Sequence, residues 1–164
     1  MKTKLILIFT VLTLSISAKA QDTEKTNITN LIDAWHKAAA DVNQKAYFDF
    51  IADDGVYIGT DSTEIWTKAE FFEWSKQYFE KGKAWTFTCN SRNIYISGDG
   101  LYAWFDELLS SRDVTLRGSG ILQKGDTDWK LKHYVLSLPV PNEKFKEVVA
   151  NMNEKVEEKR EREE

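Results

Sequence analysis

Residues 67–90 read TKAEFFEWSKQYFEKGKAWTFTCN, and the spacing of the apolar side chains changes within this stretch. Thr67 and Glu70 have the spacing of a helix capping box. Phe71 and Trp74 then begin a series of apolar residues placed three or four positions apart, which is typical of an amphipathic helix. We therefore predict a helix that begins at this cap and ends near residue 82.

After this helix the apolar period becomes two, which indicates a strand. Trp85, Phe87 and Cys89 alternate with polar residues, as in a strand with one buried face, so we expect Cys89 to be a small buried side chain. Short turns separate the three strands predicted next: 101–110, 116–124 and 129–138. Strands joined by short turns predict an antiparallel sheet.

Two further helices are predicted before residue 67. The first has these apolar residues on one face: Ile28, Leu31, Ile32, Trp35, Ala38, Ala39 and Val42. Asn43 can cap a second, shorter helix, and Asp53 to Gly55 is expected to turn the chain into a strand from Val56 to Gly59. Three N-terminal helices packed on a curved antiparallel sheet make an α+β domain with the shape of a cone.

The two ends of the chain differ from this domain. Residues 1–20 combine a basic start, a short apolar run and an Ala-Lys-Ala ending, which predicts a signal peptide cleaved after Ala20; the alternative is an uncleaved anchor. The apolar run is shorter than the ~20 residues that span a bilayer, so we expect export to the periplasm or the medium with no membrane attachment. The mature chain would be one domain over residues 21–141, followed by a charged C-terminal helix over residues 142–164.

Composition excludes several classes of function. The formal net charge of -4 argues against a nucleic-acid partner, because nucleic-acid binding needs a basic surface. Cys89 is the only cysteine, so no disulfide can form within the chain. His36 and His133 are the only histidines, and neither has a further ligand at metal spacing, so no metal site and no cofactor are expected.

Three polar residues on predicted strands could carry chemistry. Glu107 alternates with Phe105 and Leu109, which would place its carboxylate on an apolar face. We predict that Glu107, His133 and Arg117 converge inside the cone as a base, a proton carrier and an anion clamp. The alternative is structural: an ion pair between Glu107 and Arg117, beside a hydrogen-bonded core histidine.

A second group of candidates surrounds the expected mouth of the cone. Asp61 and Glu64 precede the capped helix, and either could act on a ligand, with Asp61 as an alternative base. The ordinary alternative is that Asp61 forms an Asx turn and Glu64 an ion pair. The aromatic candidates for the lining of a pocket are Trp35, Tyr57, Trp66, Trp74, Trp85 and Tyr134, although such rings can equally form a plain core.

Several stretches resemble the SnoaL-like domains of the nuclear transport factor 2-like (NTF2-like) superfamily, and they are spread over nearly the whole mature chain. They are Ala34–Asp41, Gly59–Asp61, Glu64–Trp66, Ala103–Glu107, Arg117–Gly120, His133–Tyr134 and Pro141–Glu143. The resemblance implies a cone-shaped domain with a pocket between helices and sheet, often a homodimer packed through the sheet.

The resemblance does not select one activity, because the superfamily includes isomerases, dehydratases, cyclases and binding domains. Our first hypothesis is a pocket for a small, partly apolar molecule, with or without cofactor-free acid/base catalysis. The alternative is a protein-interaction or dimerisation module whose cone is filled by its own side chains.

Overall fold

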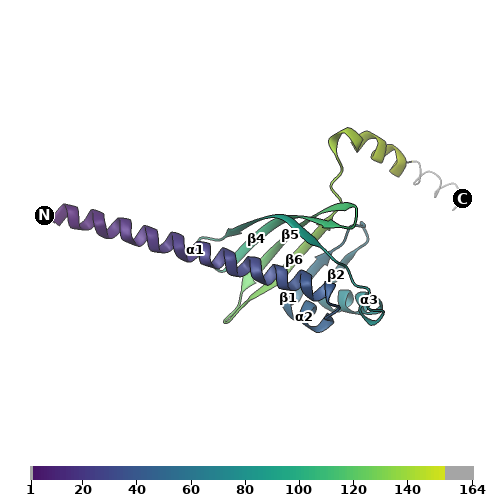
Figure 1. The fold of residues 1–164 in the computed structure, drawn as a ribbon, viewed down its shortest axis with the longest axis horizontal. Helices are drawn as coiled ribbons and strands as arrows, with labels where there is room; N and C mark the ends of the chain where they lie inside the picture. The colour runs from purple at the N-terminus through teal and green to yellow at the C-terminus, as the bar shows by residue number, and fades with distance from the viewer. Residues whose placement is uncertain (1, 154–164) are drawn as a thin grey trace, which may run out of the picture.

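The computed structural model describes the backbone of residues 2–153 and the side chains of residues 21–153. The elements follow one another in this order: α1 (Lys2–Ala40), α2 (Gln44–Phe50), β1 (Ile51–Ile58), β2 (Ile65–Thr67), α3 (Lys68–Glu80), β3 (Thr88–Ile96), β4 (Tyr102–Ser111), β5 (Val114–Lys124), β6 (Trp129–Ser137) and the short 3-10 helix η1 (Asn142–Lys144) (Figure 1). The fold is the predicted α+β type.

Six strands form one sheet in the order β2-β1-β6-β5-β4-β3. Strands β3 to β6 are the predicted antiparallel meander. The first strand, β1, is different, because it pairs in parallel with β6 at the far end of the chain. The sheet is therefore mixed and not wholly antiparallel. This pairing brings the two halves of the domain together.

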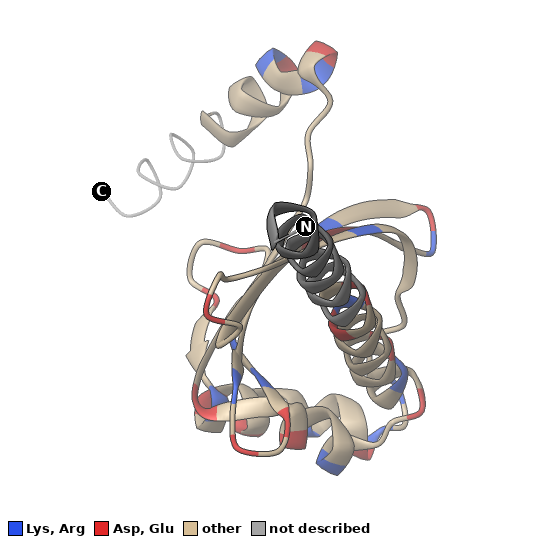
Figure 2. Cartoon of the chain, turned by 90° about the vertical axis from the view of Figure 1, so that its left-hand side faces the viewer, with Lys and Arg blue, Asp and Glu red and all other residues tan. Residues whose placement is uncertain are grey.

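The core lies between the inner face of the sheet and the three helices. Figure 2 shows the sheet curving around the side on which α1 lies. Ile28, Ile32 and Trp35 of α1 are buried, as their helical spacing predicts. From the sheet, Phe105 and Tyr134 are also buried. Large aromatic side chains fill most of this interior, as their number in the sequence indicates.

Local capping signals place two helices correctly. The side chain of Asn43 accepts a hydrogen bond from the backbone N–H of Ala46 and caps α2. Thr67 and Glu70 form the predicted capping box at the start of α3. These contacts satisfy backbone donors that a helix leaves free at its N-terminus.

Three local predictions need correction. Asp53 to Gly55 is not a turn but part of β1, where the pairing register with β6 shifts between Ile51 and Val56. Strand β3 begins at Thr88, so Trp85 and Phe87 precede it in irregular chain. Cys89 is exposed and not buried as predicted, because it lies near the start of β3, where the register with β4 shifts.

The C-terminal helix forms but does not cover the domain. After η1, residues 145–153 are helical, and Phe145 and Met152 of the predicted apolar stripe are 60% and 63% exposed. Figure 1 shows this helix standing away from the sheet. The charged tail from Glu157 to Glu164 lies outside the described residues.

At the other end, the backbone of α1 continues as one helix through the predicted signal peptide. Within the mature part of this helix, Glu24 accepts hydrogen bonds from Lys124 and from the indole of Trp129, so cleavage after Ala20 would leave this anchor in place. Within the described part of the chain, no helix is long and apolar enough to cross a membrane.

Candidate functional site

Glu107 lies at the centre of a buried polar network on the inner face of the sheet. Its Oε1 accepts hydrogen bonds from His36 Nε2 at 2.8 Å and from the Tyr134 hydroxyl at 2.9 Å. Its Oε2 accepts two from Arg92, from Nε at 2.9 Å and from Nη2 at 2.8 Å. Arg92 also forms an ion pair with Asp33 at 2.8 Å. We call Glu107, His36, Arg92 and Tyr134 the buried network.

The buried network keeps Glu107 ionised. Burial on its own would raise the pKa of Glu107, but the hydrogen bond from His36 and the positive charge of Arg92 outweigh it and lower that pKa. Burial and the nearby carboxylate raise the pKa of Tyr134 well above its usual range. A carboxylate with a lowered pKa and four hydrogen bonds is poorly suited to act as a general acid or base.

Arg117 and His133 do not belong to this network, contrary to the sequence-based prediction. Arg117 is opposite Leu108 in the register of β4 and β5, so it lies on the outer face and is exposed. A register shift in β6, between the partners of Ile121 and Leu122, turns His133 to the outer face as well. A bulge of this kind reverses the alternation of side chains and cannot be seen in the apolar pattern. The predicted grouping with Glu107 was therefore wrong.

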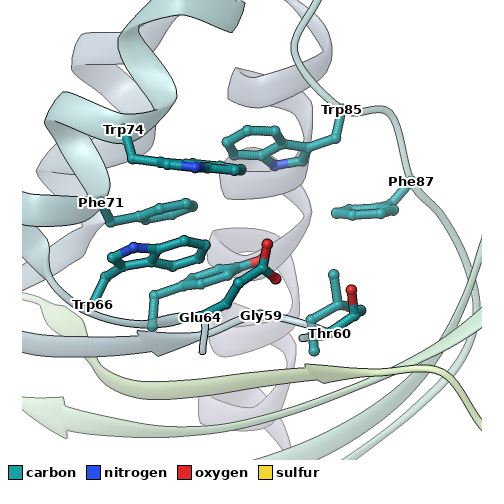
Figure 3. Close-up of a pocket in the computed structure, with 10 residues that line it drawn as sticks. Gly59, Thr60, Glu64, Trp66, Phe71, Trp74, Trp85 and Phe87 are labelled. Atoms are coloured by element: carbon teal, nitrogen blue, oxygen red, sulfur yellow. The ribbon is translucent and has the colours of Figure 1, made fainter. Parts of the chain in front are cut away.

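A separate cavity of about 200 Å³ opens between α3, the end of β1 and the segment that precedes β3. Its lining residues are Tyr57, Gly59, Thr60, Glu64, Trp66, Phe71, Trp74, Trp85, Phe87 and Leu136. Figure 3 shows the aromatic rings around the space and the carboxylate of Glu64 directed into it. We call this cavity the aromatic pocket.

Contacts between rings hold the walls of the aromatic pocket. Phe71 stacks on Tyr57 with ring centroids 4.0 Å apart and on Trp66 at 5.4 Å. Trp74 packs on Trp66 at 4.6 Å, and Trp85 stacks on Phe71 at 5.7 Å. Each ring is therefore fixed by another, so the shape of the pocket is largely formed before any ligand enters.

The loop after β1 places Glu64 in the pocket. The Gly59 N–H donates to the carbonyl of Glu64, and the Asp61 N–H donates to Glu64 Oε2 at 3.2 Å. A side chain at Gly59 would collide with Glu64, because an added Cβ would lie 2.1 Å from Oε2. The glycine thus leaves the space in which the Glu64 carboxylate lies.

Asp61 has the structural role that was the alternative in the sequence. Its Oδ1 accepts hydrogen bonds from the backbone N–H and the hydroxyl of Thr63, which makes an Asx turn. These two bonds lower the pKa of Asp61. Asp61 is exposed and is not among the residues that line the pocket.

The aromatic candidates divide into two groups. Tyr57, Trp66, Trp74 and Trp85 line the aromatic pocket. Trp35 and Tyr134 do not line it: both are buried in the core, where their rings meet edge to face with centroids 4.9 Å apart. The spacing of these residues along the chain could not separate the two groups, because it places the rings of both groups on an inner face.

Sequence reasoning missed His36 and Arg92 as partners of Glu107, and Phe87 as part of the pocket. His36 follows Ile32 by one helical turn on the buried face of α1, and Arg92 alternates with Ile94 on β3. A charged residue in an inward position of a strand is a usable signal. The residue that pairs with such a charge cannot be predicted in the same way, because its identity depends on how β3 pairs with β4.

Phe87 links the buried network to the aromatic pocket. It lines the pocket, and its ring meets that of His36 edge to face at 5.6 Å. Tyr57 also lines the pocket, and its ring packs on that of Tyr134 with centroids 5.4 Å apart. The network therefore supports the wall of the pocket from behind. Among the residues described, no group of acidic, histidine and cysteine side chains could hold a metal ion.

Comparison with known families agrees with this architecture. The model of the SnoaL-like domain matches residues 28–141, which is more than half of the chain. The chain belongs to this family. The match begins at the first buried turn of α1 and ends just after β6, so it includes both the buried network and the aromatic pocket. A search of curated proteins found no match.

Solved structures show the same fold at low sequence identity. An NTF2-like protein of unknown function from Pseudomonas putida is 16% identical over 74% of this chain and 91% of its own, with a TM-score of 0.62. A candidate dehydratase of the NTF2-like family from Streptomyces avermitilis is 13% identical over 74% and 99%, with a TM-score of 0.60. A candidate aromatic ring hydroxylase from Novosphingobium aromaticivorans is 17% identical over 70% and 87%, with a TM-score of 0.58. At such identities the likeness shows the fold alone.

Proposed function

We propose that this SnoaL-like domain binds a small, partly apolar molecule in the aromatic pocket. The observation that carries the proposal is a cavity of about 200 Å³ whose walls are mainly ring faces and Leu136, with Glu64 and Thr60 as polar groups. Ligand pockets in proteins are typically apolar with a few placed polar groups. A dry cavity of ~150 Å³ is large enough for one benzene, so the ligand, or the part of it that enters, has about the size of a single ring.

The site favours binding over acid/base catalysis. Both oxygens of Glu107 already accept hydrogen bonds, and its carboxylate lies behind the pocket wall. Arg117 and His133, the predicted partners in proton transfer, are on the outer face of the sheet. If the pocket does support a proton transfer, Glu64 is the carboxylate in its lining that is directed into the space.

Filling the pocket tests this proposal. Thr60 is exposed and lines the pocket, so the variant Thr60→Trp would place an indole in its entrance. We expect isothermal titration of the purified protein with cyclohexanol and benzyl alcohol to show binding that Thr60→Trp weakens by at least about tenfold. The matched control is Thr115→Trp, at an exposed position of β5 that does not line the pocket. Equal binding by all three proteins would contradict the proposal.

We further propose that the domain forms a homodimer through the outer face of the sheet. Tyr95, Trp104, Ile121 and His133 are consecutive partners across β3 to β6, which makes a continuous row. Tyr95, Trp104 and Ile121 are 45%, 48% and 43% exposed. Adjacent exposed apolar side chains of this size are typical of an interaction surface.

Export is proposed from the first 20 residues, whose pattern favours a signal peptide cleaved after Ala20. The mature protein would then act in the periplasm or the medium, without a membrane anchor. Mass spectrometry of the protein secreted or released from the periplasm would show an N-terminus at Gln21.

A further inference from the structure

The aromatic pocket contains a carboxylate that the protein itself does not neutralise. Among the described residues, Glu64 forms no ion pair, and the one hydrogen-bond donor to its carboxylate is the Asp61 N–H, at 3.2 Å from Oε2. Several other carboxylates of this domain have cationic partners: Glu24 pairs with Lys124, Asp53 with Lys68, and Glu107 with Arg92. Oε1 of Glu64 thus has no hydrogen-bond donor among the described residues, and Figure 3 shows the carboxylate directed into the cavity.

The walls around this carboxylate are ring faces that attract positive charge. Trp66, Trp74 and Trp85 line the same cavity, together with Phe71 and Phe87. The face of an aromatic ring carries a negative potential, and indole is the strongest of these rings in binding cations. A carboxylate and several indoles around one small space therefore combine two attractions for a cation. An anionic ligand would be repelled by both.

We propose that the aromatic pocket selects a small alkylated ammonium ion. This inference rests on the proposed function, because it names the chemical class of the ligand for the same pocket. The alkyl groups of such an ion would contact the rings, and its charge would lie near the Glu64 carboxylate. A volume of about 200 Å³ suits a head group such as trimethylammonium.

The polar content of the pocket favours an alkylated over a primary ammonium ion. A primary ammonium carries three hydrogen-bond donors, and each of them needs an acceptor when water is removed. The side chains of the lining offer three oxygen-bearing groups, the Glu64 carboxylate, the Thr60 hydroxyl and the Tyr57 hydroxyl, so a primary ammonium would have to contact all three at once. A fully alkylated nitrogen has no donors to satisfy, so ring faces suffice as its surroundings.

The test uses two probes of nearly equal shape. Choline carries a trimethylammonium group, and 3,3-dimethylbutan-1-ol replaces its nitrogen by carbon and is neutral. We expect titration calorimetry of the full-length protein to show choline binding at least about tenfold tighter than the alcohol. In Glu64→Gln this preference should fall to about twofold or less. The control Glu73→Gln removes a charge from the exposed side of α3, outside the pocket, and should keep the wild-type preference.

The possible results separate the two proposals. If the alcohol binds as tightly as choline, the pocket exists but does not select cations, and the further inference is wrong. If choline is preferred but Glu64→Gln leaves the preference unchanged, the Glu64 carboxylate does not take part in selection and the inference is also wrong. If neither probe binds and Thr60→Trp has no effect on the ring-shaped alcohols, the proposed function itself fails.

Discussion

Glu107 connects α1 to the inner face of the sheet through hydrogen bonds. Its side chain is fully buried, and its four hydrogen bonds come from three elements, α1, β3 and β6. Removing one member of a buried ion pair leaves the other charge desolvated and unpaired. The role of Glu107 is therefore to fix the helix on the sheet, behind the wall of the pocket.

Glu107→Gln should destabilise the protein strongly. The amide has nearly the same shape, but it leaves the buried Arg92 guanidinium without its main counter-charge, so we expect a loss of about 3 kcal/mol in the free energy of unfolding at pH 7. Urea unfolding monitored by tryptophan fluorescence measures this loss. Glu73→Gln, which removes an exposed charge, should change the free energy by less than about 0.5 kcal/mol.

The loss of stability in Glu107→Gln should also depend on pH. The folded-state pKa of Glu107 lies below its ordinary value of 4.5, so its stabilising effect is present above pH 4.5 and is lost as the pH falls through the lowered pKa. The difference in unfolding free energy between wild type and Glu107→Gln should therefore shrink below pH 4.5. A difference that stays constant down to pH 2.5 would contradict an ionised Glu107 in the folded state.

At the scale of the elements, β5 makes room for the buried network. Gly118 is opposite Glu107 and Gly120 is opposite Phe105, so β5 presents no side chain where β4 presents a large one. A Cβ at Gly118 would lie 2.2 Å from the Tyr134 hydroxyl and 2.8 Å from Glu107 Oε1. The close approach of strand and network therefore requires glycine there.

Gly118→Ala should consequently be costly, although alanine is a small residue. The added methyl group has to displace the Tyr134 hydroxyl from Glu107, and we expect a loss of about 2 kcal/mol in thermal or urea unfolding. The matched control is Gly98→Ala, because nothing lies within 4 Å of a Cβ built at that exposed turn. Equal stability of the two variants would show that the network tolerates rearrangement.

Elements that are determined by neighbouring residues could be predicted from the sequence. The capping box at Thr67 and the cap at Asn43 depend on side chains within three residues of the helix start. The meander strands follow the apolar alternation. Two features could not be predicted, because they depend on how separate strands pair. They are the parallel pairing of β1 with β6 and the register shift that turns His133 outward.

In the candidate site, too, features set by neighbouring residues could be predicted, and features set by strand pairing could not. Glu107, Trp74 and Trp85 were predicted on inner faces because their own neighbours in the sequence indicate it, and Trp66 was predicted as a candidate for the pocket lining. The partner of Glu107 was predicted as Arg117 and is Arg92, because that choice depends on which strand pairs beside β4 and in what register.

For the whole molecule, the two faces of the sheet have different proposed roles. The inner face holds the buried network and carries the helices, whereas the outer face presents the row from Tyr95 to His133. Tyr95 and Trp104 stack on this face with ring centroids 5.8 Å apart. One domain could thus bind a ligand inside and a second copy outside.

Trp104→Glu should abolish dimer formation. A charge in the middle of an apolar interface would have to be desolvated, which costs several kcal/mol without a partner. Sedimentation velocity should show a dimer for the wild type and a monomer for the variant. Val114→Glu, exposed at the β4–β5 hairpin and outside the row, should remain a dimer. A wild-type protein that is monomeric at high concentration would refute this interface.

Entry of a small molecule into the aromatic pocket can be followed through the indole N–H signals of the six tryptophans. In a ¹H–¹⁵N spectrum titrated with choline or with 3,3-dimethylbutan-1-ol, we expect the signals of Trp66, Trp74 and Trp85 to shift with one common affinity. The signals of Trp104 on the outer face and Trp129 beside Glu24 should stay in place. Shifts confined to Trp104, or no saturable shift in the three pocket tryptophans, would contradict it.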